Sequence, residues 1–77
     1  MNYSELSIPY QLGKRIAFLR KEKGMSQLDL ALEAGVSAPY LSSLERGKRN
    51  PTLEILTNIA RALQVGLEEL FRGIAEI

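Results

Sequence analysis

The side chains in this sequence that could do chemistry are mainly cations and hydroxyls. Arg46, Lys48 and Arg49 form a short basic run soon after two serines, and residues 14–23 carry five cations against one carboxylate. Clustered guanidinium and ammonium groups bind phosphate oxygens and attract nucleic acid. A solvated surface can carry similar runs, so charge alone leaves both interpretations open.

The groups on which many enzymes and metal sites depend are missing. The chain has no histidine and no cysteine, which excludes disulfides, thiolate zinc sites and an imidazole base. Glu68 and Glu69 are adjacent acids in a helical segment, where neighbouring side chains point in different directions. We therefore expect a protein that is not an enzyme, with no metal, no cofactor and no small-molecule ligand.

Length and composition predict one globular domain over residues 1–77. Hydrophobic residues make up 45% of the 77 residues and charged residues 25%, with a mean hydropathy of -0.07. These values are ordinary for a folded protein with one modest core. No apolar run approaches the roughly 18 residues that cross a bilayer, and the N-terminus lacks a signal-peptide pattern. The expected location is the cytoplasm, with no membrane partner.

Apolar residues recur with helical spacing, and almost nothing alternates with the period of a strand. Residues 9–24 predict a first helix, and residues 27–34, with an N-terminal capping box, predict a second. A third helix follows Ser37, a fourth follows Thr52, and residues 67–77 predict the last. The expected fold class is all-α.

The second and third helices are spaced as in a helix-turn-helix over residues 26–46. Ala31 is small where the two helices must approach, and Gly35 can adopt a positive φ at the corner. The short connection through Val36 and Ser37 forces a steep crossing of the helices. Any small bundle with a glycine turn would share this pattern, so it needs support from other residues.

That support comes from a resemblance over residues 24–71. The residues that carry it are Ser26-Gln27, Leu30-Ala31, Gly35-Val36-Ser37, Tyr40-Leu41-Ser42, Leu44-Glu45-Arg46-Gly47 and Asn50-Pro51-Thr52. The segment closely resembles the Cro/C1-type (xenobiotic-response-element or lambda-repressor-like) helix-turn-helix family of bacterial and phage regulators. The resemblance implies a five-helix, nucleoid-associated transcription regulator. Such a protein would bind two-fold operator sites in double-stranded DNA as a homodimer, with its third helix in the major groove.

The same resemblance places five side chains at the major groove. They are Ala38, Pro39, Ser42 and Ser43, with Tyr40 at the edge. Positions 38, 39, 42 and 43 hold no Arg, Gln or Asn, so this helix lacks the bidentate contacts that usually specify guanine and adenine. This departs from the better-known family members. Base specificity should be modest with DNA shape contributing, and the serines could also be caps or surface residues.

Phosphate or minor-groove contacts are implied for a second set, which comprises Gln27, Ser37, Arg46, Lys48, Arg49 and Asn50. Gln27 opens the second helix, whose N-terminus favours an anion. Arg49 is the best candidate to reach a minor groove, and Lys14 or Arg15 could add a phosphate contact. Gln27 could instead be a plain solvent-exposed helix former.

Arg20 and Glu45 have a structural interpretation. Arg20 continues the inner face of the first helix one turn after Ile16, and Glu45 follows Leu44 toward the core. Each would be a partly buried charge if it were unpaired, and in the family the matching arginine and glutamate bond each other. We predict a structural ion pair.

The last helix is expected to carry apolar residues that the core does not need. The predicted core is Leu12, Ile16, Leu19, Leu30, Val36, Leu41, Leu44, Leu56, Ile59, Leu63, Leu70 and Phe71, and Leu53 shares the spacing of the fourth helix. Leu67, Ile74 and Ile77 extend the stripe and are predicted to form the dimer interface. Phe18 either joins that interface or packs under the N-terminal arm. Alternatively, the terminal helix is frayed and its apolar residues form no interface.

Two alternatives stay open within the DNA-binding interpretation. An antitoxin-like module, which binds a protein partner as well as DNA, would use the same fold. The length and the run "ERGKRN" are also similar to the controller proteins of restriction-modification systems, and a generic repressor fits equally well.

Overall fold

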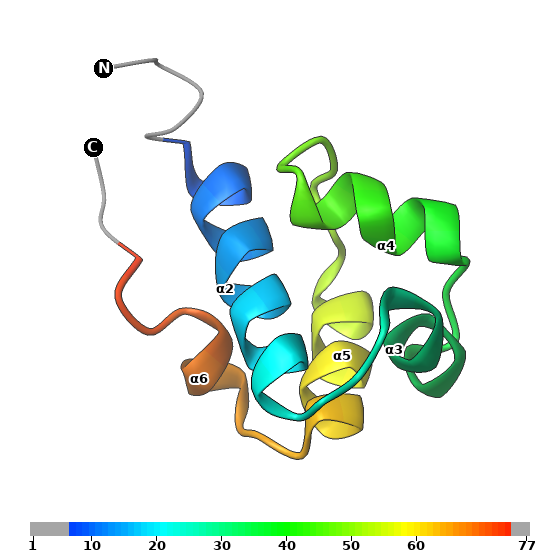
Figure 1. Cartoon of the computed structure of the whole chain (residues 1–77). Helices are drawn as coiled ribbons and strands as arrows, with labels where there is room; N and C mark the ends of the chain where they lie inside the picture. The colour runs from blue at the N-terminus through cyan, green and yellow to red at the C-terminus, as the bar shows by residue number, and fades with distance from the viewer. Residues whose placement is uncertain (1–6, 75–77) are drawn as a thin grey trace.

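The computed structural model describes residues 7–74, and over this range the chain folds into five helices without a strand (Figure 1). The helices are α2 (Ile8–Glu22), α3 (Gln27–Ala34), α4 (Ala38–Glu45), α5 (Leu53–Leu63) and α6 (Leu67–Leu70). α2 packs against α4 and α6, and α5 packs against α3 and α6. The predicted all-α class is confirmed. In the described part of the chain, every helix is too short or too polar to span a membrane.

Side-chain caps determine where four of the helices begin. At the starts of α2 to α5, a hydroxyl oxygen accepts a hydrogen bond from the backbone N–H three residues later, and the capping residues are Ser7, Ser26, Ser37 and Thr52. Ser26 and Asp29 form the predicted capping box, in which the Ser26 N–H donates to Asp29 Oδ2 at 2.9 Å. That bond is the main reason why the pKa of Asp29 lies below its ordinary value. α3 ends at Gly35, whose φ of 74° allows the turn into α4.

One core joins all five helices. Its buried apolar members are Leu12, Ile16, Leu19, Leu30, Ala31, Ala34, Leu41, Leu44, Leu56, Ile59, Ala60, Leu63 and Leu70. Val36 is partly buried against this core. The prediction that Phe71 is buried is wrong, because its exposed fraction is 42%, and Leu53 is 69% exposed. Leu53 is the first residue of α5 and Phe71 follows the last residue of α6. Each therefore lies at a helix end, outside the stripe of apolar residues that faces the core.

The last helix is much shorter than predicted. α6 covers only Leu67–Leu70, and Gly73 has a φ of 78°, which no α-helix accommodates. Leu67 and Ile74 are both partly buried against the core. They therefore do not extend one helical stripe beyond it. Ile77 lies outside the described residues.

Arg15 bonds the end of α6. Its Nε donates to the carbonyl oxygen of Glu69 at 2.8 Å, and its Nη2 donates to Glu69 Oε1 at 3.1 Å. In a longer helix this carbonyl would accept from the N–H of residue 73. The guanidinium thus caps the end of α6 and attaches it to α2.

α2 and α4 approach so closely that two positions on the contact need glycine. A Cβ atom at Gly13 would overlap the carbonyl oxygen of Leu44 and lie 2.7 Å from that of Glu45. At Gly47, which has a φ of 78°, a Cβ atom would lie 2.7 Å from the Cα of Tyr10. The end of α4 is therefore held directly against the backbone of α2.

We expect Gly13→Ala to destabilise the domain by about 1–3 kcal/mol, because the added methyl group has no space between two backbones. The loss should appear although alanine has the higher helix propensity. Urea unfolding measures it, and Lys14→Ala, at the exposed next position, is the control and should change stability by less than about 0.5 kcal/mol. A Gly13→Ala variant as stable as the wild type would contradict the close contact.

Candidate nucleic-acid interface

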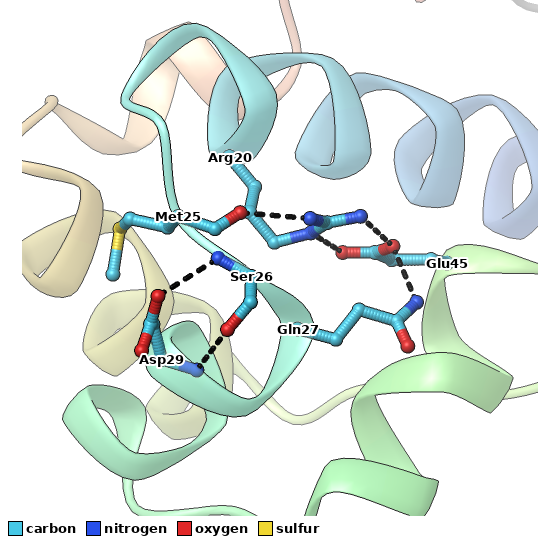
Figure 2. Close-up of polar contacts among 6 residues, drawn as sticks. All are labelled: Arg20, Met25, Ser26, Gln27, Asp29 and Glu45. Atoms are coloured by element: carbon cyan, nitrogen blue, oxygen red, sulfur yellow. Dashed lines mark hydrogen bonds and ion pairs between the residues drawn. The ribbon is translucent and has the colours of Figure 1, made fainter.

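Arg20 and Glu45 form a buried ion pair that joins α2 to the end of α4 (Figure 2). Arg20 Nε and Nη2 donate to the two carboxylate oxygens at 2.8 and 3.0 Å, and the side chains are only 10% and 6% exposed. Arg20 Nη1 donates to the carbonyl oxygen of Met25 at 2.9 Å. The predicted pair is therefore present, and it also holds the turn before α3.

Gln27 adds a third helix to this network. From the first position of α3, its Nε2 donates to Glu45 Oε1 at 2.9 Å, while its own Oε1 faces away from the carboxylate (Figure 2). The interpretation of Gln27 as a plain exposed residue is wrong, since its side chain is half-buried and oriented by the ion pair. Nothing in the local sequence pairs Gln27 with a residue 18 positions away.

An open cleft of about 430 Å³ is lined by the three residues of this network. Lys14, Lys21 and Arg46 also line it. Among the described residues, none of these three cations is in an ion pair with a carboxylate. The cleft is therefore positively charged and suited to an anion such as a phosphodiester. Lys21 was not predicted, although its spacing of seven from Lys14 places both lysines on one helix face.

Three of the five predicted groove residues on α4 lie on its outer side, whereas Ala38 and Tyr40 are partly buried and pack against the core. Leu41 and Leu44 are fully buried, while Pro39 is exposed and Ser42 and Ser43 are half-buried. α4 itself lies at an edge of the domain (Figure 1). The helix therefore offers an outer face of small side chains that could approach a DNA groove.

Two hydroxyls on this side already accept hydrogen bonds within the protein. Ser42 Oγ accepts from Arg46 Nη1 at 2.7 Å, and Ser37 Oγ accepts from the Tyr40 N–H at 3.1 Å. A hydroxyl that accepts can still donate its proton. Ser42 could thus bond a base edge, and Ser37, the cap of α4, could bond a phosphate.

The basic loop after α4 is exposed but ordered by backbone contacts. The Lys48 N–H donates to the Ser43 carbonyl oxygen at 3.0 Å, and Lys48, Arg49 and Asn50 are exposed. The guanidinium carbon of Arg49 lies 5.5 Å from the centre of the Tyr40 ring. The loop residues that are predicted to bind phosphate therefore directly follow α4 in the chain.

The side chains of Lys14 and Arg15 have different surroundings in the structure. Lys14 lines the cleft, whereas Arg15 is bonded to Glu69 and its guanidinium carbon lies 5.4 Å from the centre of the Phe18 ring. Of the two candidates, Lys14 alone is at the cleft. Phe18 is 52% exposed and carries Arg15 on its ring. The predicted packing of Phe18 under the N-terminal arm lies outside the described residues.

A family model described as helix-turn-helix matches residues 16–70, well over half of the chain. The chain belongs to this helix-turn-helix family. The predicted resemblance is thereby confirmed, and the matched residues include the whole network and every residue of the cleft except Lys14. Other members with known names or structures can therefore be compared with it directly.

Two curated relatives are named as regulators. The chain is 49% identical over 59 residues to the uncharacterized HTH-type transcriptional regulator y4dJ of Sinorhizobium fredii, covering 77% of each protein. It is 43% identical over 60 residues to the HTH-type transcriptional regulator SinR of Bacillus subtilis, covering 77% of this chain and 54% of SinR. The restriction-modification controller protein C.AhdI from Aeromonas hydrophila superposes with a TM-score of 0.81 at 38% identity, covering 90% of this chain and 100% of that one.

Arg20→Ala and Glu45→Ala should each destabilise the fold by about 3–5 kcal/mol, because each leaves a buried charge without its partner. That is a large part of the stability of a small domain. Thermal melts measure the loss. Replacing both residues together, as in Arg20→Met/Glu45→Leu, should recover much of it, and single variants that melt within a few degrees of the wild type would contradict a buried pair.

Proposed function

We propose that this helix-turn-helix protein is a DNA-binding transcription regulator that inserts α4 into the major groove of two-fold operator sites as a homodimer. Its family and relatives support the regulator function, because both relatives are named as transcriptional regulators. Such a protein would act in the cytoplasm, on the nucleoid. The single observation that supports this docking geometry is the cleft at the end of α4, where three unpaired cations meet the start of α3.

Most cations on this side of the domain are not neutralised by carboxylates. Within the described range, carboxylates pair only with Arg15, Arg20 and Arg72. The other cations at the cleft and those in the loop after α4 have no such partner, so they can replace counterions on a phosphate backbone. Two strands of phosphates border a major groove. With α4 between them, the cleft would meet one strand and the loop would lie near the backbone as well.

Base reading from α4 should be modest in this geometry. Ala38 and Pro39 can contact thymine methyl groups, and Ser42 and Ser43 can each form a hydrogen bond with a base edge through one hydroxyl. A single hydroxyl accepts or donates to several bases, so it discriminates less than a bidentate side chain. Phosphate contacts and DNA shape would therefore carry much of the affinity.

A dimer would compensate for weak readout by one copy. The domain measures 33 × 24 × 23 Å, close to the spacing of about 34 Å between half-sites one helical turn apart. One copy therefore fits one half-site. Phe71 is exposed directly after α6, and Arg15 attaches α2 to the end of α6 by donating to Glu69. Phe18 is exposed on α2, where it also lines the cleft. We propose that the dimer contact lies on this α2–α6 side, with Leu67 and Ile74 between it and the core. That Ile77 belongs to the dimer interface stays a prediction.

Selection of bound duplexes from random DNA should recover inverted repeats with half-sites about one helical turn apart.

On such a duplex, Lys21→Ala and Arg46→Ala should each weaken binding and lower the slope of log affinity against log salt by about one, because each removes a phosphate contact. Filter binding across salt concentrations measures this. Lys23→Ala, an exposed lysine that lines a different depression, is the control. Unchanged slopes in both cleft variants would contradict the docking geometry.

The dimer contact should be disrupted by Phe71→Lys and by Phe71→Glu, since each places a charge in an apolar contact. Sedimentation at micromolar concentration should show a dimeric wild type and more dissociated variants. Leu32→Lys is the matched control, because Leu32 is 72% exposed on α3. A monomeric wild type, or variants that dimerise as well as the control, would refute this interface.

A further inference from the structure

Tyr40 joins the recognition helix to the core and to the basic loop. It is the third residue of α4, and its backbone N–H is bonded to the cap Ser37. The side chain is half-buried and packs against the core cluster. Its ring is therefore held in place by the folded domain.

Arg49 lies against this ring. The guanidinium carbon is 5.5 Å from the ring centre, within the range of a cation–π interaction. Arg49 is exposed, and in the described residues no carboxylate forms an ion pair with it. The ring is thus what orients the guanidinium. Lys48, the neighbouring cation, is equally exposed and has no recorded ring contact.

The backbone that leads to Arg49 is constrained as well. Gly47 lies against Tyr10 of α2, and the Lys48 N–H is bonded to the carbonyl oxygen of Ser43. Much of the remaining freedom of Arg49 is therefore in its long side chain, whose ordering costs entropy on binding. A ring that already restrains this side chain reduces that cost.

We propose that Tyr40 is a positioning residue that holds the Arg49 guanidinium ready to bind the DNA backbone, so that the two side chains act as one unit. The inference rests on the proposed DNA-binding function and assigns Tyr40 a role different from direct groove contact. A cation–π contact is an attraction between the positive charge and the ring, so it does not use up the hydrogen bonds of the guanidinium. The N–H groups can still donate to phosphate oxygens in pairs. The loop thereby supplies a bidentate donor that positions 38, 39, 42 and 43 of α4 lack.

A double-mutant cycle on one selected duplex tests the coupling. Tyr40→Leu should weaken binding about two- to fivefold, the size expected for an exposed cation–π contact. Arg49→Ala should weaken binding more, and adding Tyr40→Leu to it should cause little further loss. Tyr40→Phe keeps the ring and should bind like the wild type. Tyr40→Leu combined with Lys48→Ala is the matched control and should show independent effects.

Nuclear magnetic resonance of the free wild-type protein tests the contact even if Tyr40→Leu folds poorly. The side-chain protons of Arg49 should be shifted by the ring current of Tyr40, and those of Lys48 should not. An absent Arg49 shift, an additive cycle for Tyr40 and Arg49, or a Tyr40→Phe variant as weak as Tyr40→Leu would each overturn the positioning role. A wild type that binds no DNA would overturn the proposed function as well, whereas binding with an additive cycle would overturn this inference alone.

Discussion

The buried carboxylate of Glu45 is the constraint on which the arrangement of this domain depends. A charge inside an apolar core is unfavourable unless it is paired and fully hydrogen-bonded. Arg20 supplies two hydrogen bonds from α2, and Gln27 supplies a third from α3. These three groups meet only when α2, α3 and α4 take one relative placement. The network therefore determines how the helix-turn-helix is attached to the rest of the domain.

The same placement divides the cations of α2 into two kinds. Arg15 and Arg20 use several donors of one planar group to hold other helices in place. Lys14 and Lys21 lie at the open cleft, where a mobile ammonium needs only to be near an anion. Structural charges and charges that we propose to bind DNA are therefore interleaved on one helix, and the cleft lies directly on the network that orients α4.

The contact between α2 and α4 links folding to recognition in a second way. Gly13 lets the end of α4 approach the α2 backbone, and Gly47 does the same for the loop that follows. Both α4 and the basic loop after it are thus held against one element. In the proposed docking geometry, a helix with few base-reading side chains gains from such rigidity, because its phosphate contacts would be oriented before DNA arrives.

Four of the five helices, the turn between α3 and α4 and most of the core could be predicted from the sequence, because their signals are local. A cap such as Ser26, a corner such as Gly35 and apolar residues one turn apart act within a few positions, and the family pattern predicted the Arg20–Glu45 pair. Packing between distant segments instead explains why Gln27 bonds Glu45 and why Arg15 bonds the end of α6 and not the cleft. These outcomes depend on partners up to 54 residues apart, and helical periodicity cannot indicate which distant group will meet a side chain once the helices pack.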